Sequence, residues 1–140
     1  MRVRLPPPAL RSNVELMNTE YASGVCNIGP DEIRQRRRFG HAGLAVSVLL
    51  LVALVALHAP HVWRLFLFFP VAVAATGYLQ AAFHFCAGFG MKGVYNFAKV
   101  GTVTPVEDPV ARSADRRKAL LISAGSAAIG LVVAIAAFLL

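Results

Sequence analysis

Three long stretches without a charged residue constrain this chain more than any other feature of its sequence. Residues 40–63, 65–91 and 119–140 contain no Asp, Glu, Lys or Arg. Each stretch is long enough to cross the roughly 30 Å of hydrocarbon in a bilayer as a helix, which needs about 20 apolar residues. A helix also satisfies its own backbone hydrogen bonds there. The sequence therefore predicts an all-α membrane protein with three transmembrane helices, an antiparallel hairpin followed by a C-terminal helix.

The composition favours a membrane protein over a soluble one. Of the 140 residues, 57% are hydrophobic and 15% are charged, whereas a soluble domain has about 25% charged residues. A soluble hairpin is the alternative for the first two stretches, but too little polar sequence remains to cover three such helices. The net charge of +7 raises nucleic acid as a partner, but no basic stripe with interleaved aromatic residues accompanies it. We expect the lipid bilayer, and no nucleic acid, as a partner.

The basic residues indicate the orientation of the helices. Seven arginines precede the first stretch and six basic residues lie between the second and the third, whereas only Arg64 separates the first two. Basic loops stay on the cytoplasmic side, so we expect an N-in, C-out topology. A proline run rather than an apolar core follows the basic start, so no signal peptide is expected. The use of Ala, Arg and Val favours a bacterial chain, and the expected location is the bacterial inner membrane.

The spans divide the chain into four expected segments. Residues 1–26 are expected to form a partly ordered cytoplasmic arm, and residues 27–91 an amphipathic lead-in with a transmembrane hairpin. Residues 92–118 are expected to form a cytoplasmic loop, and residues 119–140 the third transmembrane helix. Within the arm, one possible helical face carries Leu10, Val14, Met17 and Tyr21.

A firmer helix is expected to begin near Pro30 and to continue into the first span. Proline suits the first helical position, and Asp31 and Glu32 suit the positive N-terminal end of a helix. Basic and aromatic residues at the ends of spans anchor membrane proteins at the lipid interface. The residues expected to do so here are Arg36, Arg37, Arg38, Trp63 and Lys92.

Small residues recur at helical spacing along the third span. Membrane helices pack closely on such residues, so this face could contact either the hairpin of the same chain or another subunit. The predicted packing face consists of Ser123, Ser126, Ala127 and Gly130.

The segment GFGMKG, residues 88–93, has the G-x-G-x-x-G spacing of a dinucleotide-binding loop. Such a loop follows a β-strand and opens a helix whose N-terminus holds the pyrophosphate. Here the glycines follow a membrane helix, so the context that nucleotide binding needs is missing. We instead expect Gly88, Gly90 and Gly93 to end the second span at the cytoplasmic face.

Cys26 and Cys86 fall at the same membrane face in this topology. With His84, and with His41 as a further neighbour, they could form a metal site, because zinc and copper(I) accept thiolate and imidazole ligands. The candidate ligands are therefore Cys26, Cys86 and His84. No CxxC or HxxxH spacing enforces such a site, and isolated membrane cysteines also serve as small apolar fillers. Both interpretations stay open, and no other cofactor is expected.

Two segments on either side of one hydrophobic turn, NIGPDEIRQRRRFG and TGYLQAAFHFCAGFG, carry a family resemblance. Over about residues 27–97 the chain resembles the small two-helix inner-membrane domain that follows a rhodanese in some bacterial proteins and stands alone in others. The chain departs from that pattern in lacking a proline after the cysteine and in adding a third span. The resemblance implies a membrane hairpin and a link to sulfur handling. The matching positions are Asn27, Gly29, Arg34, Gly40, Cys86 and Gly90.

Two classes of function follow from these observations. Small size, three helices with packing faces and the lack of a polar cluster in the spans favour a non-catalytic accessory or assembly subunit of a larger membrane complex, respiratory, photosynthetic or similar. Other membrane-protein subunits are then expected as partners. The alternative is a thiol- or metal-dependent redox or sulfur-handling protein that uses Cys26 and Cys86. No Asp or Glu accompanies His84 and Gln80 in the second span, so a proton or ion path is not expected.

Overall fold

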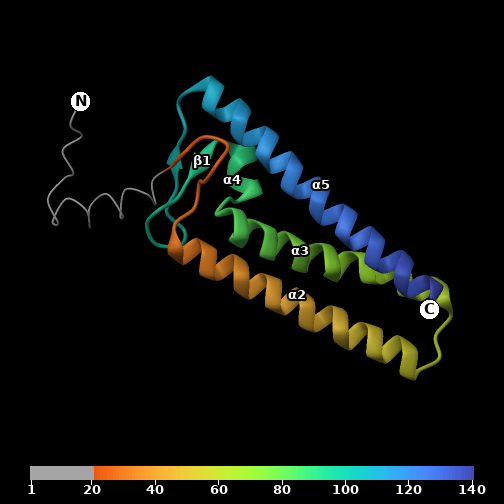
Figure 1. The fold of residues 1–140 in the computed structure, drawn as a ribbon. Helices are drawn as coiled ribbons and strands as arrows, with labels where there is room; N and C mark the ends of the chain where they lie inside the picture. The colour runs from red at the N-terminus through yellow and green to blue at the C-terminus, as the bar shows by residue number, and fades with distance from the viewer. Residues whose placement is uncertain (1–20) are drawn as a thin grey trace, which may run out of the picture.

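Three long helices lie alongside one another in the computed structural model, which describes residues 21–140 (Figure 1). Helix α2 spans Pro30–Ala56, and helix α3 spans Phe68–Phe83 and is preceded by the 3-10 helix η1, His61–Leu67. Helix α5 spans Pro109–Leu139 and returns along the pair, so that its C-terminus lies beside the turn between α2 and η1 (Figure 1).

The prediction of three membrane-spanning helices is confirmed by helix length and apolarity. The segments Pro30–Ala56, His61–Phe83 and Pro109–Leu139 are each long and apolar enough to cross a bilayer. Large hydrophobic side chains cover their outer surfaces, as expected where lipid rather than water surrounds a protein. The chain is therefore mostly helical, with three helices that are long and apolar enough to span a membrane.

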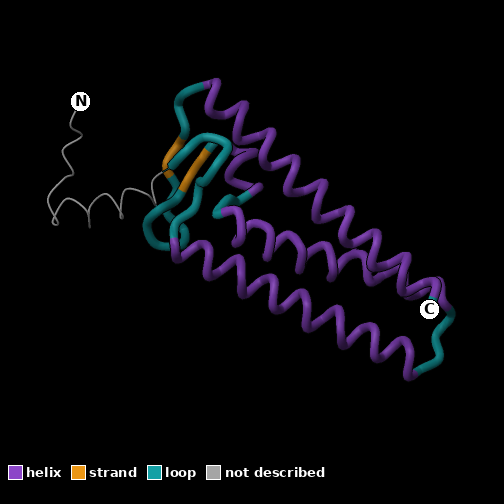
Figure 2. The backbone as a smooth tube through the Cα atoms, viewed as in Figure 1, coloured by secondary structure: helices purple, strands orange, loops and turns teal. Residues whose placement is uncertain are grey.

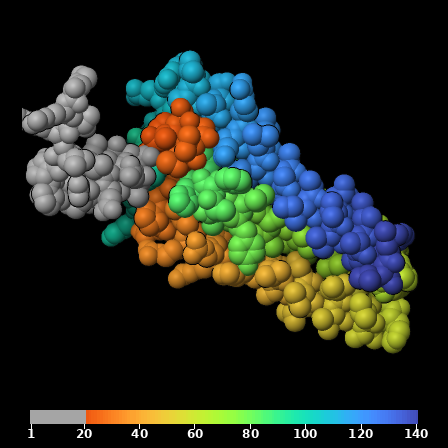
Figure 3. All heavy atoms as spheres, viewed as in Figure 1, coloured from red at the N-terminus to blue at the C-terminus, as the bar shows by residue number. Residues whose placement is uncertain are grey.

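A compact cap, residues 21–29 and 84–108, joins the three helices at one end. It contains the short helix α4, Ala87–Lys92, and a two-stranded antiparallel sheet made of β1, Val94–Tyr95, and β2, Thr104–Pro105. Figure 2 shows these strands at the end of the bundle that is opposite to the C-terminus. In the space-filling view the cap residues form a continuous mass over the ends of the helices (Figure 3). The sheet is an addition to the predicted all-α fold.

The second span is shorter than predicted. Helix α3 ends at Phe83 because His84 adopts a left-handed conformation, with φ of 52°. Gly88 and Gly90 do not end the span, since both lie inside α4, and only Gly93 ends a helix, with φ of 70°. Gly90 instead permits close packing: a Cβ there would lie 2.8 Å from the Phe85 ring.

The third helix is longer than predicted. It begins at Pro109 rather than at residue 119, and Asp108 caps it by accepting a hydrogen bond from the backbone N–H of Val110. Proline at the first position and an aspartate cap are strong helix-start signals. The interpretation of residues 92–118 as a loop is therefore wrong for its last ten residues, which are helical.

Glycines set the distance between α2 and α3. A Cβ on Gly77 would lie 2.5 Å from the backbone nitrogen of Gly40 and 2.7 Å from the carbonyl oxygen of Arg36. Further along the pair, a Cβ on Gly43 would lie 2.7 Å from the backbone nitrogen of Ala74. The two backbones therefore touch, as in other membrane helix pairs with small residues at the interface.

The packing face of α5 differs from the predicted one. Ser126 and Gly130 are buried, and Gly130 faces the carbonyl oxygen of Phe68. Ser123 and Ala127 are exposed on another side of the helix. The buried stripe follows helical spacing from the cap to the C-terminus, through Ala119, Ile122, Ser126, Gly130, Ala134 and Ala137.

Replacing Gly77 by alanine tests the close approach of α2 and α3. We expect Gly77→Ala to lower the free energy of unfolding in detergent by about 1–3 kcal/mol, because a Cβ 2.5 Å from the Gly40 nitrogen forces the helices apart. Thermal unfolding of the purified protein measures this.

The matched control is Gly125→Ala, on the same kind of helix. A Cβ on Gly125 meets only the Leu79 Cδ1 atom, at 3.7 Å, so this variant should be unchanged or more stable by about 0.5–1 kcal/mol. Equal losses in both variants would rule out backbone contact as the cause.

Candidate functional site

The cap is built around the side chain of Asn27, which has no exposed surface (0%). Its Oδ1 accepts a hydrogen bond from the backbone N–H of Cys86 at 2.6 Å, and its Nδ2 donates to the Cys86 carbonyl oxygen at 3.1 Å. Its backbone N–H donates to the carbonyl oxygen of His84 at 3.1 Å. One asparagine thus satisfies the backbone where the chain leaves α3, which a buried segment requires.

Asn96 attaches the segment between β1 and β2 to the segment that precedes α2. Its backbone N–H donates to the Asn27 carbonyl oxygen at 3.0 Å, and its own carbonyl oxygen accepts from the Gly29 N–H at 2.8 Å. Its Nδ2 donates to Oε1 of Glu32 at 3.0 Å. Glu32 is 2% exposed, so its interactions in the cap are made away from water.

Arg36 stands on α2 next to the cap and is partly buried. Its Nη2 donates to Oε2 of Glu32 at 3.2 Å and to Sγ of Cys86 at 3.3 Å, and its guanidinium carbon lies 5.7 Å from the centre of the Phe89 ring. Arg36 therefore has partners within the chain, which the prediction of a headgroup anchor does not include. Its partner Glu32 stands one helical turn earlier on the inward face, and this spacing brings the two side chains together. The neighbouring Arg37 and Arg38 are exposed.

Asp115 ties the segment before α2 to the start of α5. It is fully buried (0%) and accepts hydrogen bonds from the Tyr21 hydroxyl at 2.6 Å and from the Gly24 N–H at 2.7 Å. The Tyr21 ring also stacks on Tyr95, with 4.7 Å between ring centres. Burial, then the hydrogen bond to Asp115, raises the pKa of the Tyr21 phenol above its ordinary value.

Cys26, Cys86 and His84 do not form the predicted metal centre. Within residues 21–140, no three His, Cys, Asp or Glu side chains gather closely enough to hold a metal ion. The His84 side chain is exposed, Cys86 is buried beside Arg36, and Cys26 is half-buried. His41 lies elsewhere, with its Nδ1 atom 2.6 Å from the Tyr78 hydroxyl. Both cysteines are thiols.

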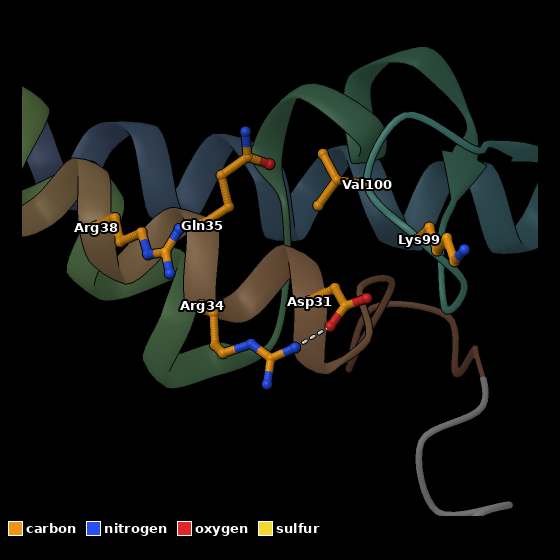
Figure 4. Close-up of a pocket in the computed structure, with 6 residues that line it drawn as sticks. All are labelled: Asp31, Arg34, Gln35, Arg38, Lys99 and Val100. Carbon is orange, nitrogen blue, oxygen red and sulfur yellow. Dashed lines mark hydrogen bonds and ion pairs between the residues drawn. The ribbon is translucent and has the colours of Figure 1, made fainter.

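A basic depression of about 680 Å³ lies on the surface beside the start of α2 (Figure 4). Arg34 forms an ion pair with Asp31 there. Figure 4 shows that the basic side chains do not converge on one point, so this is an open basic surface rather than a closed site. Its lining consists of Asp31, Arg34, Gln35, Arg38, Lys99 and Val100.

The remaining anchor residues lie at opposite ends of the bundle. Lys92 is exposed at the end of α4 in the cap, and Trp63 is exposed in η1 at the other end. Next to Trp63, Arg64 has a role that the sequence did not reveal, because its Nη1 donates to the Ala137 carbonyl oxygen at 3.3 Å. A cation at a helix C-terminus is favourable, so Arg64 closes the end of α5.

Glu32, Asn96 and Asp115 are the buried polar residues that sequence reasoning missed. The burial of Asp115 can be predicted from the sequence once a helix is taken to begin at Pro109. Asp115 then stands four residues from both Ala111 and Ala119, on one apolar face of that helix. Glu32 was interpreted only as a favourable charge at a helix start. The contact between Asn96 and Glu32 had no local signal, because the two residues are 64 positions apart in the sequence.

Comparison of the chain with protein-family models, with curated proteins and with solved structures gives no match. The resemblance to the two-helix domain stays a prediction from the quoted segments. Two of its positions meet in space, since Asn27 contacts Cys86. A third, Gly29, packs against the backbone of Phe97, where a Cβ would lie 2.9 Å from the Phe97 Cα atom. These positions carry structural contacts of the cap.

Replacing Asn27 by alanine tests whether the cap depends on this side chain. We expect Asn27→Ala to lower the free energy of unfolding by about 2–4 kcal/mol, because it removes two hydrogen bonds and leaves the Cys86 N–H buried without a partner, while the Cys86 carbonyl oxygen keeps the Gly90 N–H. Thermal unfolding in detergent measures the loss, and labelling with a small maleimide should show faster reaction of Cys86.

The comparison variant is Cys86→Ala. It keeps the backbone that Asn27 binds and removes only the thiol, so its cost should stay below about 1.5 kcal/mol. A Cys86→Ala variant that unfolds as readily as Asn27→Ala would show that the thiol, and not the asparagine, holds the cap together.

Proposed function

We propose that this chain is a non-catalytic accessory or assembly subunit of a larger membrane complex. The observation that carries the proposal is the use of the buried polar side chains in the cap. Asn27, Glu32, Asn96 and Asp115 all bind groups of the same chain, and each joins segments far apart in the sequence. Such contacts hold the three helices in one arrangement. This structural use of the polar side chains favours a non-catalytic subunit.

The outer side of α5 carries small residues on which a helix of another protein can pack. The predicted packing residues divide into two groups, since Ser126 and Gly130 pack within the chain whereas Ser123 and Ala127 are exposed. Small residues let a second helix approach closely. A helix of another subunit can therefore pack on Ser123 and Ala127 while the chain keeps its own fold.

The location that we propose is the bacterial inner membrane, with the cap in the cytoplasm and the C-terminus outside. The distribution of charge supports this orientation. The cap and the helix ends next to it carry Arg37, Arg38, Lys92 and Lys99, whereas the opposite end carries Arg64. Basic residues remain on the cytoplasmic side during insertion.

Reporters fused after Leu140 test the orientation. Alkaline phosphatase, which is active only outside the cytoplasm, should be active in this fusion, and green fluorescent protein, fused at the same position, should stay dark. The reverse result would place the cap outside and contradict the proposed topology. A fusion after Gly101, in the cap, serves as the internal control with opposite expected signals.

Co-purification from the native membrane tests the accessory role. After extraction in a mild detergent, we expect the tagged chain to retain a stoichiometric membrane-protein partner, and we expect Ala127→Trp to remove that partner by filling the small-residue face. Ala42→Trp, at an exposed position of α2, is the matched control and should retain it. Quantitative mass spectrometry measures the ratio. A chain that runs alone or only with its own copies refutes the accessory role.

The co-purification experiment also distinguishes the accessory role from the thiol-dependent alternative. If Cys26 and Cys86 carry a redox or sulfur-handling function, serine at either position abolishes function while the partner is retained. The accessory role requires instead that function follow the partner, so that Ala127→Trp has the larger effect.

A further inference from the structure

A groove runs along the outer side of the α2 and α3 pair, below the cap. Its volume is about 390 Å³. One end is polar and the rest is mainly apolar, so the groove has the polarity of an amphiphile. The groove is lined by Arg36, Phe39, Phe69, Ala72, Val73, Thr76, Gly77 and Gln80.

The polar end holds two buried atoms that lack hydrogen-bond partners among the described residues. Gln80 is 7% exposed and its Oε1 accepts no hydrogen bond, and Nε of Arg36 donates none. Both residues line the groove. Leaving such groups unpaired costs free energy, and most buried polar groups in proteins have a partner. A ligand in the groove that accepts a hydrogen bond from Arg36 and donates one to Gln80 would satisfy both atoms once the two side chains turn toward it.

The length of the groove matches one leaflet of a bilayer. Phe69 and Gln80 stand eleven residues apart on α3, which corresponds to about 16 Å at 1.5 Å per residue. This is close to half of the roughly 30 Å of hydrocarbon. The polar end lies at the cap, level with the exposed Arg37 and Arg38, and the apolar end has Phe69 and Val73 exposed.

We propose that this groove binds one anionic phospholipid with a hydroxyl headgroup, of which phosphatidylglycerol is the simplest. The phosphodiester accepts hydrogen bonds from Arg36, a headgroup hydroxyl donates to Oε1 of Gln80, and one acyl chain lies along Val73 and Phe69. Arg37 and Arg38 add positive charge near the phosphate, which favours an anionic lipid. A zwitterionic lipid would place its ammonium group beside these guanidinium groups. The inference concerns a lipid site and is independent of the accessory role.

Native mass spectrometry of the full-length protein, titrated with phosphatidylglycerol or phosphatidylethanolamine, tests the site. We expect one saturable phosphatidylglycerol, bound about tenfold more tightly than phosphatidylethanolamine, because only phosphatidylethanolamine brings an ammonium group next to the guanidinium groups. Gln80→Leu, which removes the amide at similar volume, should weaken phosphatidylglycerol binding by roughly fivefold. Val73→Trp, which fills the acyl end at an exposed position, should abolish saturable binding.

Matched controls separate the groove from general effects of substitution. Gln35→Leu removes the same amide outside the groove, in the basic depression, and Val52→Trp adds the same ring on an exposed part of α2. Both should bind phosphatidylglycerol as the parent chain does. Without lipid, Gln80→Leu should melt no lower than the parent, because it removes a buried group that has no partner. With phosphatidylglycerol, the parent should gain more thermal stability than this variant.

Three results would overturn the inference. The first is equal affinity for phosphatidylethanolamine, and the second is unchanged phosphatidylglycerol binding in both Gln80→Leu and Val73→Trp. The third is a stoichiometric isoprenoid quinone, rather than a phospholipid, in the organic extract of the purified protein. Each outcome is independent of whether a protein partner co-purifies.

Discussion

The two hydrogen bonds between the Asn27 side chain and the backbone of Cys86 are the contact on which the rest of the structure depends. Helix α3 stops at Phe83, and residues 84–86 leave the helix, with Phe85 and Cys86 buried. Asn27 satisfies the Cys86 groups on both sides, at 2.6 and 3.1 Å. The segment after Cys86 then forms α4, which packs against α5 and completes the cap.

Within the cap, chemically identical residues have different roles because of their neighbours. Arg36 is partly buried, with Glu32 at 3.2 Å, whereas Arg37 and Arg38 are exposed at the surface. Arg64 at the far end binds a helix carbonyl oxygen. Paired charges are retained where a protein excludes water only if hydrogen bonds satisfy them. The cap therefore concentrates polar contacts at one end and leaves the spans apolar.

This separation also explains how the proposed functions coexist. Contacts within the chain fix the helices through the cap and through the glycines between α2 and α3, so the outer surfaces need not contribute to folding. The exposed face of α5 is then available to a protein neighbour, and the groove between α2 and α3 is available to a lipid. Gln80 is the exception among the buried polar side chains discussed, since its Oε1 finds no partner in the described residues.

The sequence by itself determined the three spans, the hairpin order and the start of α2, because charge-free length and a proline followed by acidic residues are local signals. It also placed small residues on α5, but only the tertiary structure decided which of them pack: Ser126 and Gly130 face α3, whereas Ser123 and Ala127 do not. The cap was decided in the same way. Asn27 bonds to Cys86, and Glu32 bonds to Asn96, each across more than 55 positions of sequence. The hydropathy pattern of the sequence does not indicate a hydrogen bond between residues so far apart. Tertiary contact alone brought Arg36 to Glu32 and Cys86, and among residues 21–140 it gathers no three side chains that could hold a metal ion.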